Sequence, residues 1–120
     1  MEKRIIIAGS RNFNDYELVK KTVEKLIESD TIIISGTANG ADKLGERFAE
    51  EFNLKLVKMP ANWKTYGKSA GIIRNQEMSN FAKEKEGILV AFWDGKSNGT
   101  KEMIKIAKKD NLEVHVILFS

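Results

Sequence analysis

The stretch Gly36-Thr37-Ala38-Asn39-Gly40-Ala41-Asp42 follows the apolar run 31–35 and precedes a segment with helical spacing. An apolar run, a glycine-rich turn and a helix start together predict a strand–turn–helix unit that suits an anion. The backbone N–H groups of such a turn can approach a ligand closely, and the helix N-terminus adds unpaired donors and partial positive charge. We therefore expect a phosphate-bearing ligand to be contacted here by Gly36, Thr37, Ala38 and Gly40. For Asp42 two roles are open, capping of the helix and a hydrogen bond to a ribose hydroxyl.

Two other apolar runs end in comparable turns. Gly9-Ser10-Arg11 follows the run 5–7, and in it Gly9 allows a tight turn, Ser10 offers a hydroxyl and Arg11 can grip a phosphate in a fork. The segment 94–100 follows the run 88–92 and leads into a helix, so its N–H groups can also hold phosphate. Its expected ligand contacts are Gly95, Ser97, Asn98, Gly99 and Thr100, although Thr100 is also a plausible N-cap without a ligand. We expect the three turns to meet at one edge of a sheet around one ligand.

Strand-like and helix-like segments alternate along the whole chain. The spacing predicts strands over 4–8, 31–35, 54–59, 88–93 and 114–118, and helices over 14–27, 44–52, 70–83 and 102–109, with a loop over 61–69. Such alternation implies βαβ units with right-handed crossovers. The predicted fold is an α/β, doubly wound, Rossmann-like single domain over 1–120, with about five mostly parallel strands and helices on both faces. The strand order 3-2-1-4-5 would open the crevice between the first and fourth strands.

Composition excludes several classes of function. The chain has no cysteine and one histidine, which rules out thiolate and histidine-rich metal sites, so we expect no metal. It has no apolar run of about 20 residues and no signal-peptide pattern, so we expect a cytoplasmic protein and no membrane partner. A net charge of +3 suits an anionic ligand but falls short of the clustered excess of a dedicated duplex-DNA binder.

Further candidates lie outside the three turns. Arg74 and Asn75 fall within the predicted helix 70–83, where Arg74 is either a surface residue or is neutralised by Asp94 or a phosphate. Trp63 and Tyr66 lie in the longest predicted loop, and they either stack on a base or fill the core. Asp94 and Glu102 are the acids near the third turn, and either could act in acid–base catalysis if burial raised its pKa. The sequence shows no pair of a nucleophile and a base.

Taken in order, these motifs resemble the small stand-alone members of the SLOG superfamily, the YspA-like or YpsA-related Rossmann proteins often encoded by bacteria and phages. The resemblance covers nearly the whole chain. It rests on the three turns, on Trp63 with Tyr66-Gly67, and on Ala70-Gly71 followed by Arg74-Asn75 and Met78. It implies a nucleotide-binding fold and self-association into a homodimer or a larger homo-oligomer. AMP, ADP-ribose and NAD-related molecules are the ligands that it suggests.

Two better-known relatives suggest different activities. In the LOG-type phosphoribohydrolases an Arg-Lys pair resembles Arg74-Asn75, and a P-G-G-x-G-T-x-x-E signature resembles the segment 95–103. Their catalytic Glu falls three residues after the Thr, where this chain has Met103, and Glu102 lies one position early. The Rossmann core of the DNA-processing protein DprA, which binds single-stranded DNA, has first and second turns much like those here. Three hypotheses follow: a module that binds a nucleotide, a nucleotide N-glycosidase using Glu102 or Asp94, and a protein that binds single-stranded DNA.

Overall fold

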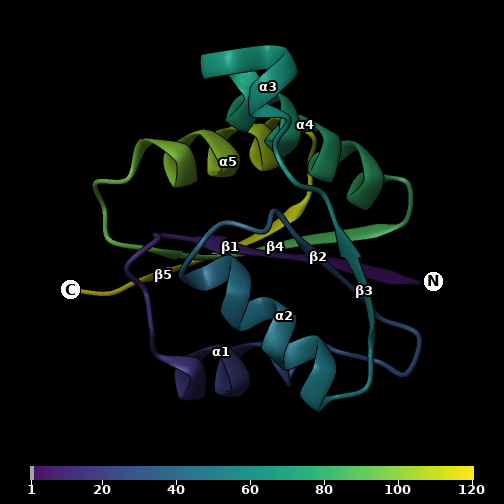
Figure 1. Cartoon of the computed structure of the whole chain (residues 1–120). Coiled ribbons are helices and arrows are strands. Elements are labelled where there is room, and N and C mark those ends of the chain that lie inside the picture. Colours follow the sequence, from purple (N-terminus) through teal and green to yellow (C-terminus); the bar gives the residue numbers. More distant parts are fainter. Residues whose placement is uncertain (1) are drawn as a thin grey trace.

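A five-stranded parallel sheet forms the centre of the computed structural model, which describes residues 2–120 (Figure 1). Its strands are β1 (Lys3–Gly9), β2 (Ile32–Ser35), β3 (Lys55–Lys58), β4 (Glu86–Trp93) and β5 (Glu113–Leu118). They lie in the order β3-β2-β1-β4-β5, and every neighbouring pair is parallel. The predicted fold class and strand order are therefore confirmed.

Helices cover both faces of the sheet (Figure 1). One face carries α1 (Tyr16–Val23) and α2 (Ala41–Glu51), and the other carries α4 (Ala70–Lys83) and α5 (Asn98–Lys109). A short helix, α3 (Trp63–Tyr66), and one 3-10 turn (Gly67–Ser69) lie above α4. Because the central strands are covered on both sides, their β-branched runs carry no polar interruption.

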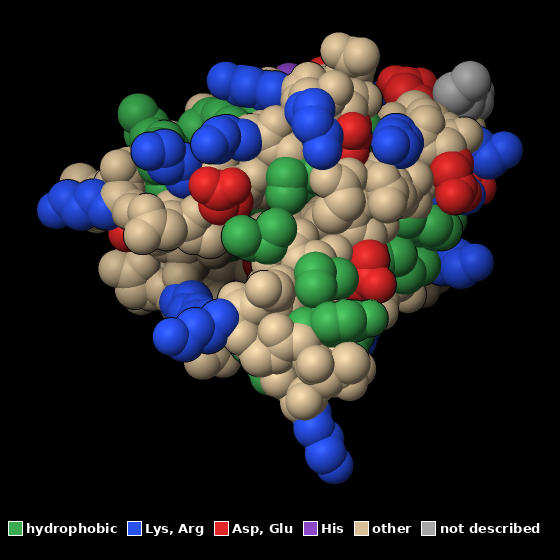
Figure 2. Space-filling view, turned by 90° about the horizontal axis from the view of Figure 1, so that it is seen from above, with side chains coloured by type: hydrophobic (Ala, Val, Ile, Leu, Met, Phe, Trp, Pro, Cys, Tyr) green, Lys and Arg blue, Asp and Glu red, His purple; other side chains and the backbone are tan. Residues whose placement is uncertain are grey.

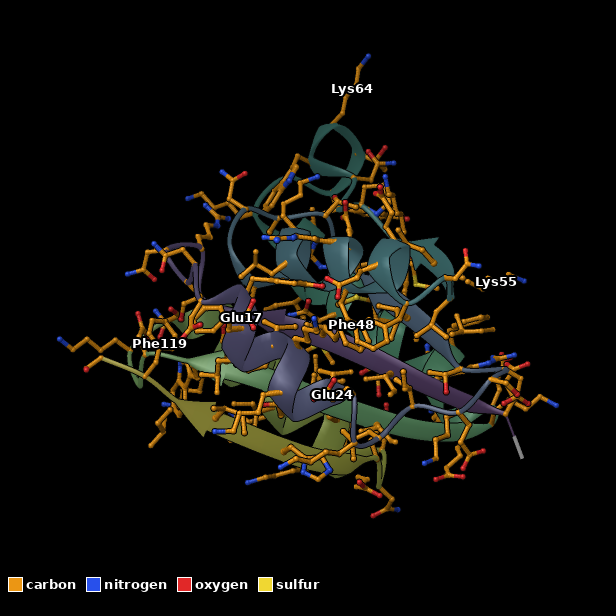
Figure 3. All side chains as sticks on the ribbon, turned by 90° about the horizontal axis from the view of Figure 1, so that it is seen from below. Glu17, Glu24, Phe48, Lys55, Lys64 and Phe119 are labelled. Atoms are coloured by element: carbon orange, nitrogen blue, oxygen red, sulfur yellow. The ribbon has the colours of Figure 1, made fainter. Side chains whose placement is uncertain are left out.

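The two faces have separate apolar cores. Phe48 of α2 packs with Ile5 and Val90 on the α1–α2 side, where Figure 3 shows it between its helix and the sheet. Ile6 and Leu89 point to the opposite side and pack with Met103 of α5. Alternate residues of each central strand therefore pack against different helix layers, which holds α1 and α2 on one face of the sheet and α4 and α5 on the other.

The boundaries of several elements differ from the prediction. The N-cap of α1 is Asp15, whose carboxylate accepts a hydrogen bond from Leu18 N at 3.1 Å, so the helix begins at Tyr16 and not at residue 14. The helix ends at Val23 rather than at residue 27, although Leu26 and Ile27 still pack against the core. These two side chains satisfy the apolar spacing without belonging to the helix, so spacing alone overestimated its length.

Two of the remaining differences change the surroundings of the predicted site. The helix expected from residue 102 begins at Asn98, so α5 starts directly after the third turn. The segment 61–69, predicted as a loop, contains α3, whose N-cap Asn62 accepts a hydrogen bond from Thr65 N at 3.1 Å. Both helices follow a polar N-cap residue, before any apolar periodicity can be recognised, and of the two N-cap residues only Asn62 caps its helix with its side chain.

Across residues 2–120, every helix is too short or too polar to span a membrane.

Candidate functional site

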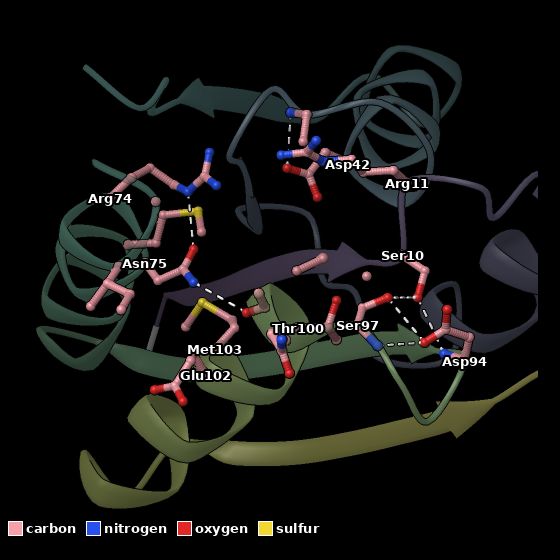
Figure 4. A pocket seen from close by; sticks show the side chains of 18 of the residues that line it. Ser10, Arg11, Asp42, Arg74, Asn75, Asp94, Ser97, Thr100, Glu102 and Met103 are labelled. Atoms are coloured by element: carbon pink, nitrogen blue, oxygen red, sulfur yellow. Dashed lines mark hydrogen bonds between the residues drawn. The ribbon is translucent and has the colours of Figure 1, made fainter. Parts of the chain in front are cut away.

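The carboxyl ends of β1, β2 and β4 lie at one edge of the sheet, where a pocket of about 560 Å³ opens. The order of the strands reverses between β1 and β4, and ligands of open α/β sheets bind at such a switch point. Figure 4 shows side chains from the first and third turns, α2, α4 and α5 around this space. The expected meeting of the three turns at one edge is thus observed.

Most of the predicted residues line this pocket, and five do not. The lining residues from the predicted set are Gly9, Ser10, Arg11, Ala38, Asp42, Trp63, Arg74, Asn75, Asp94, Ser97, Asn98, Gly99, Thr100 and Glu102. Gly36, Thr37, Gly40, Tyr66 and Gly95 are absent from the lining. The second turn, which looked strongest in the sequence, therefore contributes least to the surface of the pocket.

The first and third turns are joined by a buried hydroxyl. Ser10 Oγ lies 2.9 Å from Ser97 Oγ and accepts a hydrogen bond from Asp94 N at 3.2 Å. Asp94 Oδ1 in turn accepts from Ser97 N and Lys96 N, each at 2.8 Å, and from Ser97 Oγ at 3.0 Å. This network fixes the loop that leads into α5 (Figure 4).

The network leaves the N-terminus of α5 uncapped. Ser97 occupies the N-cap position, but its hydroxyl contacts Ser10 and Asp94 and makes no capping hydrogen bond. Among residues 2–120, the N–H groups of Asn98, Gly99 and Thr100 have no acceptor. The first turn of any helix leaves such donors for side chains, water or a ligand. Here the three residues line the pocket.

The second turn uses its donors within the protein. Thr37 N donates to Ser35 Oγ at 3.0 Å and Ala38 N donates to Asp42 Oδ2 at 3.1 Å. Gly40 has a φ of +77°, and a Cβ there would lie 2.3 Å from Ser10 O. The glycine therefore allows the first and second turns to pack together. We expected the amides of this turn to face a ligand. This expectation is wrong for Thr37 and Ala38, because their N–H groups already donate to side chains of β2 and α2.

Asp42 closes the second turn from within α2. The N-cap of α2 is Gly40, so the capping role expected for Asp42 is not observed. Its side chain is 5% exposed, and burial raises its pKa from 3.8 to about 6, against the opposing effects of the Ala38 N–H and of Arg74. A buried acid with a raised pKa in a pocket is a typical feature of functional sites.

Arg74 and Asn75 connect α4 to the other two sides of the pocket. Arg74 Nη1 donates to Gly36 O, and Arg74 Nε donates to Asn75 Oδ1 at 3.0 Å. Asn75 Nδ2 donates to Gly99 O at 3.4 Å. Burial lowers the pKa of Arg74, and the nearby Arg11 lowers it further. Arg74 is therefore half-buried and held in place, in contrast to the extended surface arginine that was one of its two predicted roles.

The two candidate acids differ in their surroundings. The Ser97 and Lys96 N–H groups lower the pKa of Asp94 to about 2, so the raised pKa required of a catalytic acid is not found there. The reason is the turn itself, which places those donors on one carboxylate oxygen. Glu102 lines the pocket from α5 and forms a long ion pair with Lys105, at 3.8 Å.

The mouth of the pocket combines apolar and basic side chains. Trp63 of α3 and Ile72 of α4 line it and are 54% and 52% exposed. Tyr66, at 47% exposed, is also on the surface but lies off the pocket, so it does not fill the core. In Figure 2, which views the molecule from the α3 side, exposed apolar side chains lie among lysines and arginines.

Sequence reasoning missed several lining residues. Asn12, Lys68, Ile72 and Met103 were not proposed as ligand contacts, although all four line the pocket. Asn12 extends the Gly9-Ser10-Arg11 turn, and its position directly after that motif was a usable signal. The others come from α4, α5 and the 3-10 turn before α4, and no local pattern showed which of their side chains would face the sheet edge.

The fold and the pocket together define a Rossmann-like α/β protein with a ligand-sized pocket at the switch point of its sheet. The model of the YspA, cpYpsA-related SLOG family matches residues 3–66, and the chain belongs to this family. Among similar proteins, the Gene 61 protein of Mycobacterium phage D29 is 30% identical over 93% of this chain and 94% of its own length.

A solved structure shares the fold. DNA processing protein A (DprA) from Streptococcus pneumoniae superposes with a TM-score of 0.73 and 17% sequence identity. The match covers 100% of this chain and 51% of the DprA chain, so this chain spans about half the length of that protein. At this level of identity the similarity concerns the fold.

Proposed function

We propose that the protein binds a nucleotide or a nucleotide-derived ligand, with a phosphate held at the N-terminus of α5. The observation that carries the proposal is the uncapped start of this helix, where three N–H groups without acceptors among residues 2–120 line a pocket. Backbone donors and the helix dipole favour an anion at such a place. The amides of the second turn are engaged within the protein and are not part of this proposed phosphate site.

Arginines supply the remaining charge. Arg11 is exposed at the pocket and makes no ion pair among the described residues, whereas Arg74 is held over Gly36. Guanidinium groups bind phosphate oxygens in a bidentate manner. Trp63 and Ile72 offer an apolar surface on the same pocket, as a base requires. AMP, ADP-ribose and NAD are therefore the first ligands to test, in keeping with a sensing role.

A second candidate function is hydrolysis of a nucleotide N-glycosidic bond. The observation in its favour is Glu102, an acid on the pocket wall one turn into α5. Asp94 is a poor general acid because its pKa is about 2. In this alternative Glu102 takes a proton from the water that attacks the sugar carbon and passes it to the base, so that the C–N bond breaks as the C–O bond forms. Asp94 then has a structural role. Single-stranded DNA binding, suggested by the fold of DprA, is a third outcome for the same experiments.

One panel separates these functions. Thermal unfolding is measured with AMP, ADP-ribose, NAD and an oligothymidylate, and base release is followed by chromatography. A ligand at 100 times its dissociation constant adds about 2.7 kcal/mol of stability. Stabilisation by a mononucleotide without base release supports the proposal. Base release that is lost in Glu102→Gln supports the glycosidase, and steeply salt-dependent oligonucleotide binding alone supports the third function.

The Gly99→Val variant tests the position of the phosphate. A Cβ at Gly99 meets no atom within 4 Å, so the side chain is accommodated in the free protein and blocks only what approaches the helix start. We expect at least about a tenfold loss of AMP affinity, which corresponds to about 1.4 kcal/mol. Lys108→Val, an exposed position of the same helix outside the pocket, is the matched control. A folded Gly99→Val protein with unchanged affinity would contradict the proposed phosphate site.

A further inference from the structure

The pocket has one buried carboxylate in its wall. Asp42 is 5% exposed, and its Oδ2 accepts the Ala38 N–H at 3.1 Å. Its Oδ1 has no hydrogen-bond partner among residues 2–120, and no fully enclosed side-chain oxygen or nitrogen in that range lacks one. Oδ1 is therefore an acceptor with access to the pocket, and Figure 4 shows the carboxylate at the pocket wall.

Because of this carboxylate, two opposite walls of the pocket differ in their hydrogen-bonding groups. Asp42 follows β2, whereas the uncapped N-terminus of α5 follows β4, and β1 lies between these strands. The first turn lies between the two walls, since Ser10 O accepts from Ala41 N at 3.3 Å and Ser10 Oγ lies 2.9 Å from Ser97 Oγ. One wall presents donors and the other presents an acceptor. A phosphate at the α5 wall is thus away from Asp42, whose negative charge would repel it.

The group that suits the Asp42 wall is a neutral donor attached to the phosphate. A sugar with free hydroxyls meets this requirement, because a hydroxyl donates to a carboxylate without bringing a second negative charge. Ionised acceptors form stronger hydrogen bonds than neutral ones. The charged groups around Asp42 are Arg74 from α4 and Lys43 and Glu46 from α2, and Arg11 lies near Arg74.

We propose that Asp42 accepts a hydrogen bond from a ribose hydroxyl of the ligand and so selects ribonucleotides over deoxyribonucleotides. This inference rests on the proposed function, since it needs a nucleotide phosphate at α5. It assigns Asp42 a specificity role in addition to its structural hydrogen bond to Ala38. It also disfavours DNA as the physiological partner of this pocket.

The test compares AMP with 2′-deoxy-AMP and 3′-deoxy-AMP by titration calorimetry. The wild-type protein is expected to bind AMP about tenfold more tightly than at least one deoxy analogue, the loss of one hydrogen bond to a charged group. In Asp42→Asn and Asp42→Ala, AMP and the analogue that binds weakly to the wild-type protein are expected to bind with nearly equal affinity. Asp30→Asn, an exposed carboxyl outside the pocket, should keep the wild-type ratio.

The pH dependence adds an independent readout. All three nucleotides carry the same phosphate, so its titration cancels in the ratio of their affinities. The ratio should rise as the pH rises through about 6, where Asp42 ionises. A ratio that falls over this range would mean that the protonated carboxyl, as a donor, is the form that favours the hydroxyl, and it would overturn the inference.

The outcomes distinguish the two proposals. Equal wild-type affinities for AMP and both deoxy analogues overturn the role of Asp42 and leave the proposed nucleotide site intact. Failure of all three nucleotides to bind overturns the proposed function itself, and this inference with it. Because the wild-type ratio needs no variant, the test holds even where an Asp42 variant does not fold.

Discussion

Asp42 shows how one residue serves both the fold and the pocket. Its carboxyl is nearly enclosed, yet it anchors the second turn through the Ala38 N–H. Gly36 makes room for this arrangement, since a Cβ there would lie 2.9 Å from Asp42 Oδ2 and 2.8 Å from Arg74 Nη1. Burial of the Asp42 carboxyl raises its pKa from 3.8 to about 6. Such a group links the stability of the protein to pH.

The stability of the wild-type protein should fall relative to Asp42→Asn as the pH rises from about 4 to about 7. The folded pKa of about 6 lies above the ordinary value of 3.8, so in this window the folded state retains a proton that the unfolded state has released. About 2 pKa units at about 1.4 kcal/mol each give a difference of about 3 kcal/mol. Urea unfolding of both proteins at several pH values measures it. A difference that does not change with pH would mean that Asp42 ionises as it does in water.

At the scale of elements, the position of a helix start decides what its donors can do. The N-termini of α2 and α5 both follow parallel strands at the same sheet edge. In α2 the turn before the helix packs on the first turn, where Ala41 N donates to Ser10 O at 3.3 Å. In α5 the N-cap hydroxyl is engaged by Ser10 and Asp94, and the helix donors stay open. Similar sequence motifs therefore give different surfaces.

The position of the short helix α3 predicts where the base of a bound nucleotide stacks. Trp63 lines the pocket mouth from α3, and Tyr66 on the same helix does not. If a base stacks on Trp63, Trp63→Ala should weaken AMP binding by about tenfold or more, since one such stack is worth about 1–3 kcal/mol. Tyr66→Ala is the matched control and should bind normally. Quenching of tryptophan fluorescence by AMP that is lost in Trp63→Ala reports the contact, because the second tryptophan, Trp93, donates to Ser97 O beside the same pocket. Equal affinities of both variants would argue against stacking.

At the scale of the whole molecule, the two edges of the sheet differ. The edge strand β3 carries Lys55 and Lys58, and lysines discourage pairing with another chain. The opposite edge strand, β5, exposes Val116 and Leu118, the latter at 68%. Lys64 on α3 points away from the rest of the molecule (Figure 3). Glu113 and His115 pair at 2.6 Å near the start of β5, so the apolar carboxyl half of this edge is the better candidate for contact between copies.

We predict that the self-association implied by the family resemblance uses β5. Leu118→Lys should shift sedimentation-velocity profiles toward the monomer, because it places a charge on the strand edge without disturbing the core. Ile72→Lys, an equally apolar exposed site on α4, is the comparison. A wild-type protein that is monomeric at all concentrations, or a dimer lost only in Ile72→Lys, would contradict the prediction.

The sequence by itself determined the α/β class and the five strands, because β-branched runs, glycine turns and amphipathic spacing act over a few residues. Their order and the sheet edge at which the turns meet were predicted from general rules for βαβ folds, and the structure confirms the order. It did not determine that Gly40 serves turn packing, that Asp94 is held at a low pKa, or that α5 begins at Asn98 with free donors. Those properties depend on hydrogen bonds between segments far apart in the chain, such as Ser10 with Ser97 and Arg74 with Gly36. Only the tertiary structure decides which of several equivalent donors are used by the protein and which remain for a ligand.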